Sequence, residues 1–165
     1  MIVVSDSSPL VILAKLHQFD SLQRLFKKIY VTREVFQEVA VVGAGLPGST
    51  EVRTATWIEM KEVKQPELMQ LVMGKHNLGA GEVSSILLAK EVGADRLLLD
   101  DYKARRVAGE QSIRVLGTIG LLEAFYARGY LTDLSHTFRQ LIAEKAYIDE
   151  RLLSHRLRAL GLDPL

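Results

Sequence analysis

The 165-residue sequence contains no cysteine, which excludes a disulfide framework, a thiolate zinc site and a cysteine nucleophile. The chain also has no large excess of positive or negative charge. The chain has 21 Lys and Arg residues against 20 Asp and Glu residues, so its net charge is only +1. Bulk charge therefore cannot attract a polyanion, and any nucleic-acid partner must be bound by a local basic patch.

Long apolar runs are also absent, and none approaches the roughly 18 residues that a membrane-spanning helix needs. The first residues, MIVVSDSSP, contain no basic segment and reach an acid at position 6, unlike a secretory leader. We therefore expect a protein without membrane association that acts in the cytoplasm. Aromatic residues make up 7% of the chain and form no obvious stacking platform for single-stranded nucleic acid.

The composition that remains is that of a globular protein. Hydrophobic residues account for 48% and charged residues for 25% of the chain, which is enough apolar material to bury a core. The length fits a single domain over residues 1–165. We divide it into a core at 1–131 and a helical C-terminal extension at 132–165.

Short β-branched runs alternate with helical patterns along the chain. The runs predict strands at residues 2–5, 29–31, 57–63, 96–99 and 113–115. Apolar spacing and capping signals predict helices at 7–16, 21–28, 33–42, 66–73, 79–92, 102–111, 117–128, 134–147 and 149–160, with a loop at 74–79. This alternation predicts an α/β fold with three layers, in which helices cover both faces of a central parallel sheet.

Acidic residues follow two of the predicted strands. Asp6 comes after the first strand, and Asp100 and Asp101 come after the strand at 96–99. Ligands of open parallel sheets bind beyond the carboxyl ends of the strands, so these acids are candidates for a site. Each one alone is also a reasonable helix N-cap, but two acidic strand ends in one sheet weaken that interpretation.

Two glutamates lie beside apolar helical stripes. At about 100° per residue, Glu38 falls on the flank of one stripe, and Glu34 points further toward solvent. That stripe consists of Val35, Phe36, Val39 and Val42. Glu82 begins a second stripe, which continues at Ile86 and Ala89. A solvated position for Glu38 and a first-turn position for Glu82 are the ordinary alternatives.

If these acids converge, they form a cluster whose members repel one another and raise each other's pKa. A hard divalent cation removes that repulsion. Mg²⁺ or Mn²⁺ prefers carboxylate oxygens and can activate water for attack on phosphorus. We therefore predict a catalytic cluster with metal ligands at Asp6, Glu82 and either Asp100 or Asp101, together with Glu38.

Three basic residues come directly after the acidic pair: Lys103, Arg105 and Arg106. They are candidates for binding a nucleic-acid backbone beside the metal. The alternative is a solvated helix face on which Arg105 pairs with an acid. The four histidines show no metal-ligand spacing.

Residues 43–48 read G-x-G-x-x-G, which is typical of a dinucleotide-binding loop when it follows a strand and opens a helix. Here Pro47 lies inside the motif, and the preceding residues fit a helical apolar face. A surface loop is the simpler interpretation.

Several stretches together resemble the PIN-domain nucleases, and more closely the branch that includes VapC-type toxins of toxin–antitoxin pairs. They are VVSDSSPLVILAKL, VTREVFQEV, LGAGEVSSILLAKEVGADRLLLDDYKARRVA and VLGTIGLLEAFYARGYL, and they span about residues 2–131. The resemblance implies a metal-dependent ribonuclease with Asp6, Glu38, Glu82 and Asp100 as its acidic set. Many PIN domains have aspartate at the position of Glu82.

The resemblance also implies that the hydroxyls of Ser7, Ser8 and Thr118 line the pocket, with helix capping as the alternative. It further implies a homodimer and a small antitoxin partner. We therefore predict a Mg²⁺- or Mn²⁺-dependent endoribonuclease that hydrolyses phosphodiester bonds in RNA. The alternatives are a nuclease for DNA or structured nucleic acid, and a non-catalytic nucleotide-binding or partner-binding module.

Overall fold

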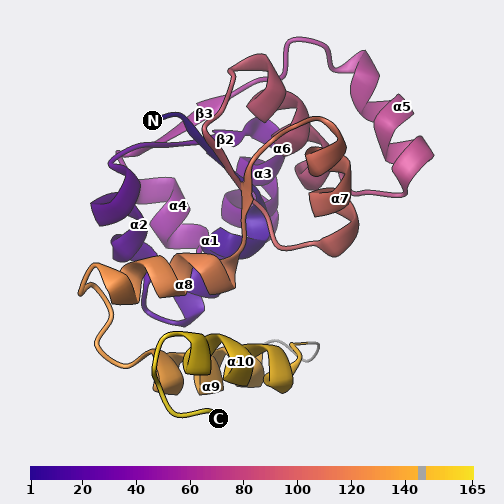
Figure 1. Cartoon of the computed structure of the whole chain (residues 1–165). Coiled ribbons are helices and arrows are strands. Elements are labelled where there is room, and N and C mark those ends of the chain that lie inside the picture. The colour runs from indigo at the N-terminus through magenta and orange to yellow at the C-terminus, as the bar shows by residue number, and fades with distance from the viewer. Residues whose placement is uncertain (145–147) are drawn as a thin grey trace.

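A computed structural model describes residues 1–144 and 148–165. Its centre is a five-stranded sheet in the order β3-β2-β1-β4-β5 (Figure 1). The strands are β1 (Val3–Ser5), β2 (Ile29–Thr32), β3 (Ile58–Lys61), β4 (Arg96–Leu98) and β5 (Val115–Leu116). Neighbouring strands are parallel, so their carboxyl ends lie at one edge of the sheet.

Helices connect these strands and continue beyond the last one. They are α1 (Ser7–Lys15), α2 (Phe19–Phe26), α3 (Arg33–Phe36), the π-helical η1 (Gln37–Val42), α4 (Ser49–Thr54), α5 (Glu67–His76), α6 (Ala80–Glu91), α7 (Tyr102–Glu110), α8 (Thr118–Ala127), α9 (Leu134–Glu144) and α10 (Glu150–Ala159). The helix predicted at 134–147 is confirmed as far as Glu144, and residues 145–147 lie outside the described residues. Within the described residues, no helix has the length and apolar character needed to cross a membrane.

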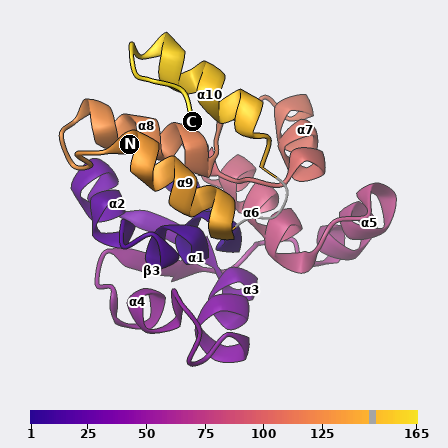
Figure 2. The same ribbon diagram turned by 90° about the horizontal axis from the view of Figure 1, so that it is seen from below.

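The sheet is buried on both faces because its apolar residues alternate in direction. Val3 and Leu98 pack into one hydrophobic cluster, whereas Val4, Leu97 and Leu99 pack into the other. The first cluster joins the sheet to α1, α2, α8, α9 and α10, and the second joins it to α5, α6 and α7. Figure 2 shows these two groups of helices on opposite sides of the molecule. The predicted three-layer α/β fold with a parallel sheet is confirmed.

The two C-terminal helices are part of the first cluster. Phe138 and Leu141 of α9 and Leu153 and Leu157 of α10 are fully buried and pack with residues of α1, α8 and the sheet. Burial of large aliphatic and aromatic side chains is the main source of stability in such a core. The helices at residues 132–165 therefore share one hydrophobic core with the rest of the chain.

One predicted helix differs in its winding. Thr32 caps α3, because its Oγ1 accepts a hydrogen bond from the Val35 amide at 3.2 Å. From Gln37, however, the chain continues as the wider η1. The wider turns shift the residues out of the predicted α-helical phase, and Val42 is 82% exposed rather than part of the apolar face.

The loop predicted at 74–79 is wrong in its first half. Helix α5 continues through Gly74 to His76 and ends where Asn77 adopts a left-handed conformation with φ of 52°. An asparagine in this conformation is a common helix terminator, so the end signal was Asn77 rather than Gly74. Strand β5 begins at Val115, two residues after its predicted start at residue 113.

Substitutions on α10 test whether the extension stabilises the fold. Leu153→Ala should lower the free energy of unfolding by about 2 to 5 kcal/mol, because it leaves a cavity in the shared core. Leu160→Ala, at the end of the same helix and 46% exposed, should change it by less than about 1 kcal/mol. Urea denaturation followed by circular dichroism measures both. Equal, small effects would show that α10 does not contribute to the core.

Candidate active site

The predicted site lies where the chain changes direction across the sheet. Strand β1 pairs with β2 on one side and with β4 on the other, and such a switch point is where open α/β sheets bind ligands. Asp6 directly follows β1, and Asp100 follows β4 after one intervening residue. The Asp6 amide donates a hydrogen bond to the Leu98 carbonyl at 2.9 Å, which holds the two strand ends together.

Asp6 occupies the N-cap position of α1, but its side chain makes no capping hydrogen bond. The residue is only 5% exposed. Burial raises the pKa of its carboxyl to about 7, against a lowering by the Ser7 amide, and the nearby charges of Glu38, Glu82 and Asp100 raise it further. The N-cap explanation is therefore insufficient for Asp6, whose carboxylate lies among other acids.

Glu38 and Asp6 reach the same small space above the first turn of α6. A Cβ atom added to Gly81 would lie 2.7 Å from Glu38 Oε2 and 3.3 Å from Asp6 Oδ1. The Ser7 hydroxyl donates to the same Glu38 oxygen at 2.9 Å. The absence of a side chain at Gly81 is thus what allows the two carboxylates to approach each other.

Glu82 belongs to this acidic group and also has a structural role. Its Oε2 accepts a hydrogen bond from the Gly79 amide at 2.8 Å, at the start of α6. Burial raises the pKa of its carboxyl, the capping bond lowers it, Asp101 and Glu38 raise it, and Lys103 lowers it. Glu82 therefore occupies the first-turn position given above as the ordinary alternative, and it also lies near other acids.

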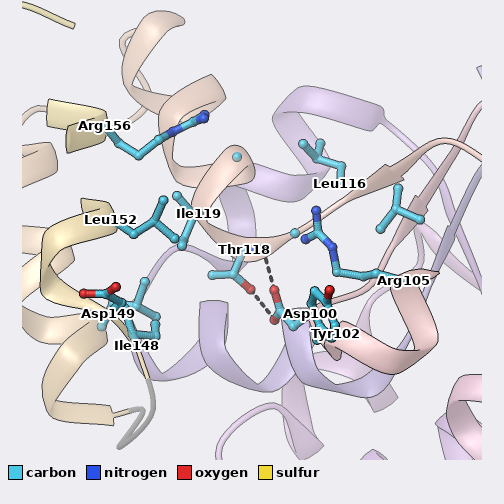
Figure 3. Close-up of a pocket in the computed structure, with 14 residues that line it drawn as sticks. Asp100, Tyr102, Arg105, Leu116, Thr118, Ile119, Ile148, Asp149, Leu152 and Arg156 are labelled. Atoms are coloured by element: carbon cyan, nitrogen blue, oxygen red, sulfur yellow. Dashed lines mark hydrogen bonds between the residues drawn. The ribbon is translucent and has the colours of Figure 1, made fainter. Parts of the chain in front are cut away.

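Asp100 and Asp101, the two candidates for one metal-ligand position, have different hydrogen-bond partners. Asp101 is the N-cap of α7 and accepts a hydrogen bond from the Ala104 amide at 2.8 Å. Asp100 instead accepts bonds from the Thr118 amide at 2.7 Å and the Thr118 hydroxyl at 2.6 Å (Figure 3). It also accepts one from the Ser8 hydroxyl at 3.1 Å. Asp100 is thus held at the strand end, while Asp101 acts on Glu82 through its charge.

The predicted hydroxyls all contact acids of this group. Ser7 donates to Glu38, and Ser8 and Thr118 donate to Asp100. Ser7 and Thr118 are buried, so their hydroxyls have few other partners available. These hydrogen bonds fix the directions of the Glu38 and Asp100 carboxylates.

The acids fit a hard divalent cation in their chemistry. Asp6 and Glu38 present oxygens to one space, and carboxylate oxygens are the ligands that Mg²⁺ and Mn²⁺ prefer. Over residues 1–144 and 148–165, no group of three or more His, Cys, Asp or Glu side chains is arranged to hold a metal ion. Glu82 and Asp100 accept hydrogen bonds from backbone amides, with which a cation would have to compete.

The three basic residues are not equivalent. Lys103 is close enough to Glu82 to lower its pKa, and Arg105 lines the same cleft as Asp100. Arg106 instead forms an exposed ion pair with Glu110 at 3.9 Å along α7. The structure therefore brings two of the three cations to the acidic site.

Two clefts meet at the strand ends. One has a volume of about 770 Å³ and contains Asp6, Ser7, Glu38 and Glu82. The other has a volume of about 850 Å³ and contains Asp100, Tyr102, Arg105 and Thr118. Ser8 lines the first cleft and donates to Asp100 in the second, so the acids form the boundary between them.

The predicted direction of the Glu34 side chain is wrong. It was expected to point further toward solvent than Glu38, yet it is the less exposed of the two and lines the same cleft. Its Oε2 is buried and has no hydrogen-bond partner among the described residues. The short α3 packs against α6, and this contact covers a helix face that apolar spacing alone marks as polar.

Two further residues at the site were not predicted from the sequence. Gly81 is recognised only from its position between two carboxylates that are distant in sequence. Tyr102 is 80% exposed and lies at the cleft that contains Asp100. An aromatic residue directly after an acidic strand end was the available signal.

The glycine motif at 43–48 lacks the context of a dinucleotide site. It follows η1 rather than a strand, and the helix after it, α4, has only six residues. Gly48 has φ of 93°, and its amide donates to Glu51 at the start of α4. The glycines thus form a turn between two helices, as the surface-loop interpretation expected.

Comparison with protein families supports the PIN-domain resemblance. A family model described as a PIN domain, DUF3368, matches residues 2–162. The match includes α9 and α10 as well as the sheet. No curated protein matches the chain.

The buried position of Asp6 leads to a prediction for the metal-free protein. Its pKa rises from an ordinary 3.8 to about 7 on folding, so between these values the folded state binds more protons than the unfolded state. The free energy of unfolding in EDTA should therefore receive a contribution from Asp6 that falls by up to about 4 kcal/mol as pH rises through this window.

Urea unfolding at several pH values tests this, with Asp6→Asn as the variant that lacks the titrating group. Relative to the parent protein, the variant should gain stability as pH rises from about 4 to 7, and the difference should level off above that. Parallel pH profiles for the two proteins would contradict the assignment of a raised pKa to Asp6.

Proposed function

The chain belongs to the PIN-domain family of nucleases, and we propose that it is a metal-dependent endoribonuclease that hydrolyses phosphodiester bonds in RNA. The observation that carries the proposal is the meeting of Asp6 and Asp100 at adjacent strand ends, with Glu38 and Glu82 close to Asp6. Bringing four acids from four separate segments together lowers the stability of the fold, because like charges repel one another. Such a destabilising cluster is typical of a functional site.

Asp6, Glu38, Glu82 and Asp100 would hold Mg²⁺ or Mn²⁺. When bound, the cation would supply Lewis-acid stabilisation of the phosphate charge and a water with a lowered pKa. Asp101, whose Oδ1 is engaged by the Ala104 amide, would contribute by its charge near Glu82 rather than as a ligand.

The remaining site residues would position the acids and the substrate. The Ser7 hydroxyl orients Glu38, and the Ser8 and Thr118 hydroxyls orient Asp100. Lys103 and Arg105 are exposed on α7 beside the acids, where they would attract the phosphates on either side of the scissile bond. Because the net charge is only +1, this local pair is needed to offset the repulsion between the acids and RNA.

We further propose that the protein is the toxin of a toxin–antitoxin pair, acting in the cytoplasm as a homodimer that a small antitoxin protein inhibits. The support for this role is the resemblance of the motifs at residues 2–131 to VapC-type toxins. A nuclease for DNA or structured nucleic acid would use the same acids, so the substrate comparison below distinguishes the two.

Cleavage of single-stranded RNA should require added Mg²⁺ or Mn²⁺ and stop in excess EDTA. Asp6→Asn should reduce kcat at least about 100-fold, because it removes an anionic ligand at nearly constant shape. The matched control is Asp163→Asn, an exposed aspartate near the C-terminus, which should cleave like the parent. Gel assays with RNA, single-stranded DNA and duplex substrates measure this. Cleavage that persists in EDTA, or that is faster on DNA, would contradict the proposal.

Gly81→Ala tests the shared space between Asp6 and Glu38. The added methyl group would push the Glu38 carboxylate aside at little cost to the fold, because the displaced atom is the end of a flexible side chain. Alanine also favours a helix over glycine by about 1 kcal/mol, so stability should be kept or increased. Mg²⁺-dependent cleavage and the rise in melting temperature with Mg²⁺ should both fall.

The control is Gly74→Ala on α5, where a Cβ atom meets no other atom within 4 Å. It brings the same gain in helix propensity without touching an acid, so its cleavage and its response to Mg²⁺ should match the parent. If Gly81→Ala also behaves like the parent, the space above α6 is not where the cation binds.

A further inference from the structure

The cleft of about 850 Å³ extends the acidic site toward the C-terminal helices. Asp100 and Thr118 lie at its centre in Figure 3, with Arg105 on one side and Ile148 and Leu152 on the other. Its volume is within the range of about 300 to 1,000 Å³ that is typical of small-molecule sites. A ligand that fills it must therefore lie directly beside Asp100.

The walls of this cleft are mostly apolar. Residues from β5 and α8 form one wall, and residues from α9, α10 and the chain before α10 form the other; they include Leu116, Ile119, Leu141, Ile148 and Leu152. Leu152 is 47% exposed although it is a large aliphatic residue. Such walls exclude a phosphate group and accept a flat apolar one.

The polar groups differ between the two sides of the cleft, because Asp149 lies beside Ile148 and Leu152, on the side away from Arg105 (Figure 3). Tyr102 is exposed at the cleft, and Arg105 on the next turn of the same helix supplies a positive charge beside Asp100. Arg156 is already paired with Glu123, so it is a structural part of the wall. A ligand with a flat ring system and an anionic backbone matches this arrangement, because the ring can enter the cleft while the phosphates stay near Arg105.

We propose that this cleft is a nucleobase-binding subsite, which takes the base of a nucleotide next to the scissile bond of single-stranded RNA and stacks it against Tyr102. The inference rests on the nuclease function proposed above and adds a substrate class to it. Only an unpaired base can turn away from its neighbours into such a cleft, so the subsite selects single strands. The C-terminal extension, through Leu152, would then take part in choosing the substrate.

Variants of the cleft test this in steady-state cleavage of a single-stranded RNA. Tyr102→Ala should raise KM roughly tenfold with little change in kcat, since stacking on an aromatic ring contributes mainly to binding. Tyr102→Phe keeps the ring and should restore the parent KM. A merely structural role of Tyr102 would change kcat and KM together, or change neither.

Leu152→Asp places a negative charge in the apolar wall and should also raise KM. Leu160→Asp is its matched control, because Leu160 ends the same helix, is exposed to almost the same extent at 46%, and does not line the cleft. If Leu152→Asp and Leu160→Asp have the same KM, the cleft does not bind substrate.

RNA substrates that lack one base identify which nucleotide places its base in the cleft. In the parent protein, one abasic position next to the cleavage site should raise KM about tenfold, whereas in Tyr102→Ala the same change should add little, because both remove one contact. Abasic substitutions that act equally in the two proteins would overturn the proposal.

A binding measurement separates this proposal from the nuclease function. The same RNA with 2-aminopurine at the identified position, or at each position in turn if no cleavage occurs, is titrated with protein in EDTA. Quenching that Tyr102→Ala abolishes and Tyr102→Phe retains would support the subsite even if the parent cleaves no RNA. Quenching that is the same in all three proteins, or absent from the parent, would overturn it.

Discussion

The parallel pairing of β1 with β4 is the constraint on which the site depends. It aligns Ser5 with Leu98 and extends through the bond between the Asp6 amide and the Leu98 carbonyl, which joins residues more than ninety positions apart in the chain. Without this register, Asp6 and Asp100 would not leave the sheet side by side. Helices α1 and α8 also begin at this edge, at Ser7 and Thr118, and the positive ends of their dipoles partly offset the charge of the acids.

The acids are tolerated because each is given a donor within the protein. The Ser7 amide donates to Asp6 and the Ser7 hydroxyl to Glu38, the Gly79 amide donates to Glu82, and Thr118 and Ser8 donate to Asp100. Asp6 is the most buried of the four, and burial raises its pKa to about 7, so it carries a large electrostatic cost. A cation that took these carboxylates as ligands would therefore compete with the hydrogen bonds that hold them in the metal-free protein.

Much of this architecture could be predicted from the sequence, because the short continuous apolar runs around Val4 and Leu98 and the acids at strand ends are local signals. Other features depend on contacts between distant segments. The different hydrogen-bond partners of Asp100 and Asp101 depend on the direction in which the chain leaves β4, and the partial burial of Glu34 depends on the contact between α3 and α6. The wider turns of η1 also left no distinct mark, since the apolar pattern at 35–42 fits an α-helix equally well.

Helix α10 contributes both to the hydrophobic core and to the cleft beside Asp100. Leu153 and Leu157 lie four residues apart on its buried face and pack into the core that contains α1 and the sheet, while Leu152 and Arg156, also four residues apart, form the neighbouring face at the cleft beside Asp100. Because both faces belong to one rigid helix, the packing of the first determines where the second stands relative to Asp100. Residues on the cleft face can therefore change what the cleft accepts without altering the core, whereas a change on the buried face must affect both.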